Sequence, residues 1–287
     1  KKMPRELKKY YISSSEEDIQ EMLRSLNLNE LNDLYTNIPK SVLHNELDNS
    51  TGLDHNANAL DLETTAKKNK ISPSFIGDCL RSYSVPEMTP FVCGIRGLTT
   101  AYTPYQPERS QGTLWSLWNY SNTLSKITGF EAINASLYDR STCLYEAIVT
   151  SKKISKKKGQ KFLLSEGIHP NDIEVINTLS QGTDYTYEYI PLCKETGKTD
   201  LKILKEKIET QDFYGFAFPQ VNSLGVIENV DEMTSICSEQ KVATVAIIDI
   251  MDINSQGLKK PTEYGFSKEG VDIIIGEGNH RIVAEKI

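Results

Sequence analysis

Short apolar runs typical of strands alternate with helix-like patterns from about residue 142 to residue 275. Strands are expected at 161–165, 184–190, 213–221, 242–249 and 271–275. The helices around and between them are expected at 142–154 and 170–182, and two more begin near 199 and 229. The run VATVAIID at 242–249 is apolar almost throughout, as in a strand buried on both faces. This alternation predicts an α/β domain with a mostly parallel sheet that helices cover on both faces.

The first 70 residues show a different pattern, with short helical segments and few residues to form a core. Serines at 13–15 followed by Glu16 and Glu17 predict a helix N-cap with a capping-box glutamate. Further helices are expected at 30–35 and 59–69, with a polar loop at 45–58. We therefore predict two parts, an N-terminal helical arm at 1–70 and a large α/β domain at 71–287.

Residues 99–142 lie between these two patterns and are rich in Tyr, Thr, Gln, Asn and Asp. They contain the loop string YTPYQP at 102–107 and the string NASLYD at 134–139. Between the strings, a helix is expected to start after Ser110 and to stop at Gly129. Trp115 and Trp118 in that helix are expected to pack in or beside the core. Convergent polar and aromatic groups on a loop are typical of a binding site, which makes this segment a candidate.

A second set of candidates follows from the predicted sheet, because ligands bind outside the carboxyl ends of parallel strands. The residues that follow the predicted strands are His169, Gln220, Asn222, Asp249 and 276–281. The sequence has no Walker-type or Gly-x-Gly-x-x-Gly phosphate loop, so any phosphate group would have to bind differently.

Composition and charge exclude several classes of function. The formal net charge of −7 argues against general nucleic-acid binding, which normally requires a basic face. The five cysteines are widely spaced and never form Cys-x-x-Cys, so neither a disulfide framework nor a zinc site is expected. No apolar run approaches the roughly 20 residues that span a bilayer. The N-terminus has no apolar signal region, so a cytoplasmic protein is expected.

The strings at 102–107 and 134–139 belong to a longer set. The set is PSFIG at 73–77, AYTPYQPE at 101–108, SQG at 110–112, NASLYD at 134–139, HP at 169–170, NSLGVIE at 222–228, KPTEYG at 260–265 and DIIIGEG at 272–278. Together these strings resemble the glycine dehydrogenase (decarboxylating) family, the P-protein of the glycine cleavage system. The resemblance is to its N-terminal half, a separate subunit 1 in many prokaryotes, and it runs from about residue 16 to residue 278.

The resemblance implies the fold of type I pyridoxal-phosphate aminotransferases. The family condenses glycine with pyridoxal phosphate, releases the carboxylate as CO2, and passes the aminomethyl group to the lipoyl arm of the H-protein. In two-subunit forms the Schiff-base lysine belongs to subunit 2, so that partner would hold the cofactor and this chain would not bind it covalently. The implied partners are subunit 2 and the lipoyl H-protein, in a homo- or hetero-oligomer. The family continues past position 278, so we expect its C-terminal small domain to be missing and the large domain to be incomplete.

The resemblance also assigns site residues, in vestigial form. Cofactor-binding positions fall on Asn134, Thr142, His169 and Asp249, and supporting-loop positions fall on Tyr102, Thr103, Tyr105, Gln106 and Gln111. No catalytic residue is predicted, because His280 stands where subunit 2 has its lysine. No metal site is predicted either.

Alternatives remain open at several of these positions. Asp252 competes with Asp249 for the carboxylate on the cofactor ring, and His169 either stacks on that ring or caps the helix that starts at Pro170. Arg140 stands where subunit 1 usually has a glycine beside the phosphate, and Gly77-Asp78-Cys79 also departs from the family pattern. Two hypotheses follow. The chain is a subunit-1 component that works with a subunit 2, or it is a catalytically dead pseudoenzyme that acts as a binding or scaffolding module.

Overall fold

The computed structural model describes residues 14–43, 52–73, 85–157, 159–254 and 257–277. The chain divides into two compact units, Lys1–Cys79 and Leu80–Ile287. Asp78, Cys79 and His280, which the sequence marks as departures from the family pattern, lie outside the described residues.

The first unit is built from short helices. They are α2 (Glu16–Ser25), η1 (Leu31–Tyr35), η2 (Lys40–Val42) and α3 (His55–Ala66). The capping box of α2 joins Ser15 to Asp18 and not to a glutamate. The carboxylate of Asp54 accepts the Asn56 amide at 2.9 Å, and this cap lets α3 begin earlier than the expected residue 59. Among the described residues of this unit only Leu23 is a buried apolar residue, so these helices share little core.

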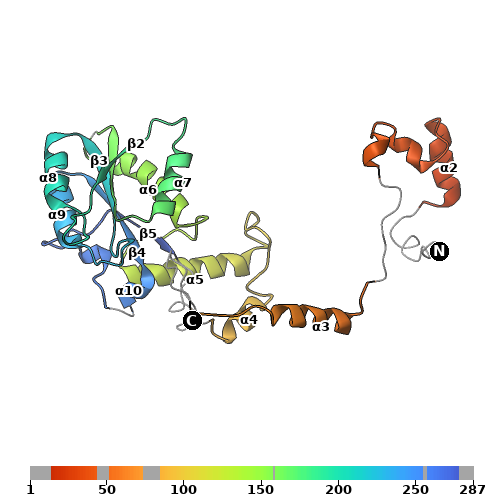
Figure 1. Ribbon diagram of the computed structural model, residues 1–287, viewed down its shortest axis with the longest axis horizontal. Coiled ribbons are helices and arrows are strands. Elements are labelled where there is room, and N and C mark those ends of the chain that lie inside the picture. The colour runs from red at the N-terminus through yellow and green to blue at the C-terminus, as the bar shows by residue number, and fades with distance from the viewer. Residues whose placement is uncertain (1–13, 44–51, 74–84, 158, 255–256, 278–287) are drawn as a thin grey trace. The chain divides into compact units, whose positions relative to one another are not determined.

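The second unit is an α/β domain around one parallel sheet (Figure 1). Its strands are β1 (Lys161–Ser165), β2 (Thr186–Ile190), β3 (Phe213–Pro219), β4 (Ala243–Asp249) and β5 (Ile273–Glu277). They lie in the order β2-β1-β3-β4-β5, and every neighbouring pair is parallel. The predicted fold class is confirmed, and a strand lies within or across each of the expected strand segments.

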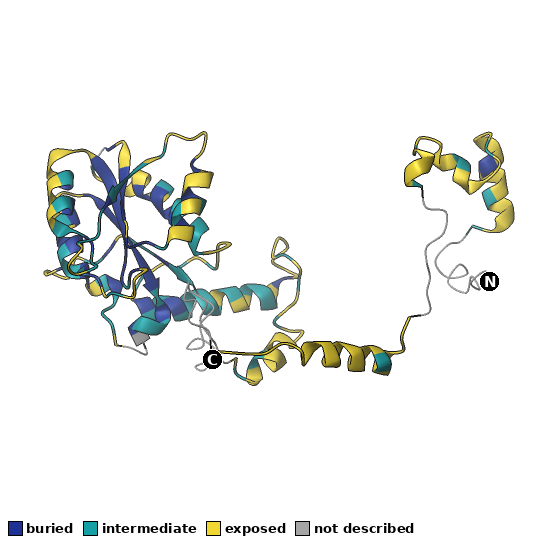
Figure 2. Cartoon of the chain, viewed as in Figure 1, coloured by how far each residue is buried: buried dark blue, intermediate teal, exposed yellow. Residues whose placement is uncertain are grey.

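Helices cover both faces of this sheet, so its strands are the most deeply buried part of the unit (Figure 2). The helices are α6 (Arg140–Ile154) and α7 (Pro170–Leu179) on one face, and α8 (Leu201–Thr210) and α9 (Val230–Glu239) on the other. On the first face Ile148 of α6 packs in one cluster with Phe162. On the second face Met233 of α9 packs in another cluster with Phe216. β3 is buried at every position because it lies at the centre of the sheet, between both clusters.

The remaining helices lie outside these two layers. They are α4 (Met88–Cys93), α5 (Gln111–Thr128), α10 (Ile250–Asn254) and η3 (Pro261–Glu263). As predicted, α5 stops at Gly129, whose φ of 84° is the left-handed conformation typical of a helix C-terminus. The C-terminal half of α5 packs Leu124 against Ile250 of α10. No helix in the described part of the chain is long and apolar enough to cross a membrane.

Several caps differ from those expected because aspartates provide them. α6 begins at Arg140, ahead of the expected residue 142, because the carboxylate of Asp139 caps it. α8 is capped by Asp200 and not by Thr199. Ser110 precedes α5 as predicted, but its hydroxyl makes no cap and donates instead to the Gln106 carbonyl at 2.8 Å.

Candidate functional site

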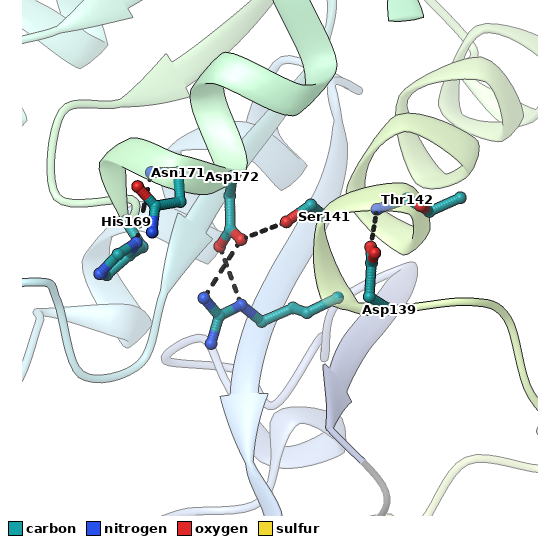
Figure 3. Close-up of polar contacts among 7 residues, drawn as sticks. Asp139, Ser141, Thr142, His169, Asn171 and Asp172 are labelled. Carbon is teal, nitrogen blue, oxygen red and sulfur yellow. Dashed lines mark hydrogen bonds and ion pairs between the residues drawn. The ribbon is translucent and has the colours of Figure 1, made fainter. Parts of the chain in front are cut away.

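The carboxyl ends of the strands form one edge of the sheet, because the strands are all parallel. The direction of winding reverses between β1 and β3, and such a reversal creates the crevice where ligands bind in open α/β sheets. The chain passes from the C-terminus of α6 into the amino end of β1, so the N-terminus of α6 lies toward the carboxyl edge. Figure 3 shows this N-terminus beside the start of α7, which follows β1.

His169 lies at this edge as the N-cap of α7. Its Nδ1 atom accepts a hydrogen bond from the Asn171 amide at 3.3 Å (Figure 3). Nδ1 must be unprotonated to accept this bond, so any proton on the neutral ring is on Nε2. Of the two roles considered for His169, the described contacts support the helix cap.

Asp249 is the last residue of β4 and is half-buried at the same edge. Its carboxylate accepts the Met251 amide at 2.9 Å, at the start of α10. Asp252, the competing carboxylate, lies one turn further along inside α10. Asp249 is therefore the member of the pair that ends a strand at the carboxyl edge.

The N-terminus of α6 is capped by Asp139, whose carboxylate accepts the Thr142 amide at 2.7 Å. This hydrogen bond is the main cause of the lowered pKa of the Asp139 carboxyl, and the Ser141 amide contributes in the same direction. The amides that open the helix therefore already face a negative charge. Of the predicted site residues, Thr142 takes part in this cap through its backbone.

Arg140, the residue after the cap, is paired with a buried carboxylate of α7. Its Nε donates to Asp172 at 2.8 Å and its Nη2 donates to the other Asp172 oxygen at 3.1 Å. The Ser141 hydroxyl adds a third bond to the same carboxylate at 2.6 Å. Asp172 is only 3% exposed, so the pair is shielded and ties α6 to α7.

The loop at 102–107 is held by hydrogen bonds within itself and to the start of α5. The Gln111 side chain donates to the Pro107 carbonyl at 2.6 Å, while the carbonyls of Thr103 and Gln106 accept the Ser110 hydroxyl. The rings of Tyr102 and Tyr105 project into solvent and are the most exposed aromatic side chains of this loop. The hydrogen bonds of this loop join it to the start of α5, whereas those of His169 and Asp249 lie at the starts of α7 and α10.

A cavity of about 870 Å³ lies beside β5, between α5, α6 and residues 130–139. Asn134 lines it and is exposed there. Glu277, at the carboxyl end of β5, places its charge near two other lining groups. Burial raises the pKa values of Tyr120 and Cys143, and the carboxylate of Glu277 raises both further. Within the described ranges, no cluster of His, Cys, Asp and Glu is arranged to hold a metal ion.

A buried polar network lies at the reversal point between β1 and β3. At its centre Glu228, which is 4% exposed, accepts the Thr199 amide at 3.0 Å and the Asn222 side chain at 2.9 Å. The Thr199 hydroxyl also hydrogen-bonds Ser165, the last residue of β1, at 2.7 Å. The network joins the ends of β1 and β3 to the start of α8. Sequence reasoning selected Asn222 but missed Glu228, which lies in the string NSLGVIE; that string was the available signal.

This domain is the large domain of the type I pyridoxal-phosphate fold. The features that define it are the sheet order, the helices on both faces, and the ligand-binding crevice at the carboxyl edge of the strands. A sphingosine-1-phosphate lyase from Burkholderia pseudomallei shares this fold at a TM-score of 0.52, with 13% identity over 82% of this chain and 57% of that one. A crystal structure of glycine decarboxylase, the P-protein of the glycine cleavage system in inhibitor-bound form, matches at a TM-score of 0.66. Identity to it is 28%, over 93% of this chain and 58% of that one.

The chain belongs to the glycine cleavage system P-protein family, whose model matches residues 9–283. A probable glycine dehydrogenase (decarboxylating) subunit 1 from Legionella pneumophila strain Corby is 32% identical over 270 residues, 93% of this chain and 58% of that protein. The corresponding protein of Aquifex aeolicus is 30% identical over 268 residues, 93% of this chain and 59% of that protein. The chain thus spans a little over half the length of the curated relatives that it matches.

The fold implies pyridoxal phosphate, and the N-terminus of α6 tests whether the residues present fit it. A phosphate group binds at a helix N-terminus through free amides and positive charge. Here the amides face the Asp139 carboxylate, and Asp172 compensates the charge of Arg140. A phosphate dianion at this position would meet a carboxylate and a neutralised guanidinium. The residues of this site therefore do not fit the phosphate group of the cofactor.

Proposed function

We propose that this chain is a subunit-1-type component of the glycine cleavage system P-protein. In the cytoplasm it pairs with a subunit 2 that holds pyridoxal phosphate and provides the Schiff-base lysine. The pair decarboxylates glycine and transfers the aminomethyl group to the lipoyl H-protein. The observation that carries this proposal is the family match across residues 9–283, together with relatives that are probable subunits 1.

In this proposal the carboxyl edge is a half-site that supports the partner's chemistry without holding the cofactor. The pairing of Arg140 with Asp172 supports this role, because it keeps the N-terminus of α6 closed to phosphate. The rings of Tyr102 and Tyr105 are exposed, which supports a role for this loop as a surface that another chain covers. His280, in the family's lysine position, leaves the covalent step to subunit 2.

The first experiment asks whether the chain binds the cofactor by itself. The purified chain is mixed with pyridoxal phosphate, reduced with borohydride and analysed by mass spectrometry. We expect no lysine of this chain to carry the reduced cofactor. A labelled lysine would contradict the proposal, because the chain would then hold the cofactor itself.

The second experiment tests the partnership directly. The chain is co-expressed with the subunit 2 encoded in its own genome and assayed with H-protein for exchange between the glycine carboxyl and bicarbonate. We expect exchange only when both subunits are present, with subunit 2 alone as the matched control. Exchange by subunit 2 alone at the same rate would remove the need for this chain.

A second candidate function is a catalytically dead pseudoenzyme that acts as a binding or scaffolding module. The ion pair of Arg140 with the buried Asp172 favours it, because the pair occupies the helix end with a contact between two side chains of this chain. The co-expression experiment separates the two functions. A stable complex that lacks exchange activity assigns the chain to the scaffolding class.

A further inference from the structure

The carboxylate of Glu228 is the point on which the buried hydrogen bonds at the carboxyl edge converge. It accepts the Thr199 amide at 3.0 Å, the Thr199 hydroxyl at 3.1 Å and the Asn222 side-chain amide at 2.9 Å. Burying a carboxylate is unfavourable unless donors or an opposite charge compensate it. These three bonds therefore hold Thr199 and Asn222 in place around Glu228.

The Thr199 hydroxyl extends this arrangement to the end of β1. It has a single proton, which it donates to Glu228, so it must be the acceptor in its 2.7 Å contact with Ser165. The Ser165 hydroxyl therefore donates to Thr199, and it accepts the Gly167 amide at 2.9 Å. A one-way chain of donors thus runs from the Gly167 amide through two hydroxyls to the Glu228 carboxylate. Hydrogen bonds in such a chain polarise and strengthen one another.

This chain of hydrogen bonds fixes the loop at 165–169. A side chain has no room at Gly167, because a Cβ there would lie 2.9 Å from the Asn222 side chain and 3.1 Å from a Glu228 oxygen. The Gly167 carbonyl accepts the Ser223 amide at 2.8 Å, so both polar groups of the Gly167 backbone are bonded. The position of Gly167, two residues before His169, is therefore set largely by residues that follow β3.

The position of this loop in turn decides which nitrogen of His169 carries the proton. The Nδ1 atom accepts the Asn171 amide at 3.3 Å, a long bond that depends on where the loop enters α7. While that bond forms, the neutral ring has its proton on Nε2. If the loop moved away, Nδ1 would lose this donor and both tautomers would become accessible.

We propose that Glu228 is a positioning residue, whose carboxylate acts through Thr199 and Ser165 to fix the loop at 165–169 and the tautomer of His169. Its effect on the reaction rests on the proposed function, in which the carboxyl edge is a half-site for subunit 2. The side chains that form the network are all buried, and they come from the segments that follow β1, β2 and β3.

The test follows the imidazole nitrogens of the full chain by NMR after labelling with isotopic histidine. The sequence has four histidines, so the spectrum is simple, and His169→Gln identifies the signals of His169. At mildly alkaline pH, where the ring is neutral, we expect the parent to show a single Nε2–H tautomer of His169. A parent in which His169 already averages between both tautomers would overturn the proposal.

Two variants break the chain of hydrogen bonds at different points. Thr199→Val replaces the hydroxyl with a methyl group and keeps the backbone amide. Glu228→Gln places an NH2 group opposite the Thr199 amide, because both carboxylate oxygens accept that amide in the parent. Each variant should shift the Nδ1 signal of His169 toward the average of the two tautomers. If Thr199→Val does not fold, Ser165→Ala removes the other hydroxyl of the chain and should cause the same shift.

Matched controls separate positioning from stability. Thr199→Ser retains the hydroxyl and should keep the parent spectrum. Thr244→Val removes an equivalent hydroxyl at the opposite end of the sheet, because Thr244 also donates its amide and its hydroxyl to one carboxylate, that of Asp272. It should destabilise the chain to a similar extent but leave the His169 signals unchanged. Equal shifts from Thr199→Val and Thr244→Val would overturn the proposal.

The exchange assay with subunit 2 measures the effect of the same variants on the reaction. Thr199→Val should lower kcat for exchange between glycine and bicarbonate by up to about 100-fold, the effect of a small misplacement near a reacting centre. The KM for glycine and the rate of Thr244→Val should stay at the parent values. A parent rate in Thr199→Val would overturn the proposal. If the parent complex shows no exchange, the proposed function fails, and the imidazole spectra still decide whether Glu228 positions His169.

Discussion

Two regions of this protein are rich in aromatic residues, and one of them is buried whereas the other is exposed. β3 carries Phe213, Tyr214, Phe216 and Phe218, all buried at the centre of the sheet. Residues 88–118, named here the aromatic segment, carry Phe91, Tyr102, Tyr105, Trp115 and Trp118, all largely exposed. The two tryptophans stack on each other, with ring centroids 5.2 Å apart, and remain 56% and 58% exposed. The expectation that they pack in or beside the core is therefore wrong for the isolated chain.

The two regions differ in what covers them within the described chain. β3 is covered on both faces by helices of its own chain, whereas the N-terminal half of α5 is exposed on much of its surface (Figure 2). The aromatic segment contains only three charged residues, Arg96, Glu108 and Arg109. Aromatic enrichment with few charges is the composition of the buried centre of a protein–protein interface.

The largest expected effect is in β3. Phe216→Ala should lower the free energy of unfolding by about 3–5 kcal/mol, because it removes a fully buried ring and leaves a cavity. Trp118→Ala, the matched change in the aromatic segment, should lower it by less than about 1 kcal/mol, because the ring is exposed at the surface. Urea unfolding followed by circular dichroism measures both. Equal losses would mean that the tryptophan is part of the chain's own core.

This comparison also explains how far the sequence could predict the structure. The strands were predictable because apolar runs such as VATVAIID are local patterns. The pairing of Arg140 with Asp172 was not, because it joins residues 32 positions apart that only the packing of α6 on α7 brings together. Burial of Glu228 depends in the same way on the meeting of β1 and β3. The exposure of the tryptophans could not be predicted either. The sequence pattern of an apolar helix face is the same whether its own chain or a partner covers that face.

The next effect concerns association. If the aromatic segment meets subunit 2, Trp118→Ala should weaken the complex by about 30-fold, the loss of about 2 kcal/mol typical of a central interface residue. The two tryptophans are the only ones in the chain and both lie in this segment, so their emission should shift to shorter wavelength when subunit 2 is added. Phe266→Ala is the control, because Phe266 is also exposed but lies outside the segment. An unchanged spectrum on complex formation would place the interface elsewhere.

A smaller effect is expected at the cap of α6. Asp139→Ala should cost about 1 kcal/mol of stability near pH 7, because the Thr142 amide loses its partner. The pKa of Asp139 is lowered in the folded chain by that amide, so the stabilisation is present above the unfolded value of about 3.9. It is lost as the pH falls through the folded value.

The pH dependence distinguishes this cap from the surrounding contacts. The stability difference between the parent and Asp139→Ala should shrink when unfolding is measured at successively lower pH. Asp139→Asn is the control, because asparagine caps as well as aspartate but does not titrate. A difference that stays constant down to the acid limit would show that the charge of Asp139 contributes nothing.

The smallest effect is expected from the hydroxyl group of Tyr214 in β3. Tyr214 is buried beside Phe162, and its hydroxyl finds no hydrogen-bond partner in the described part of the chain. Burying an unpaired hydroxyl is unfavourable, so Tyr214→Phe should be neutral or raise the unfolding free energy by up to about 1 kcal/mol. Tyr187→Phe should instead lower it by about 1 kcal/mol, because its hydroxyl is hydrogen-bonded to Ser180. Urea unfolding of both variants measures the sign of each change in unfolding free energy. If Tyr214→Phe lowered the unfolding free energy as much as Tyr187→Phe, the Tyr214 hydroxyl would have to make a stabilising hydrogen bond.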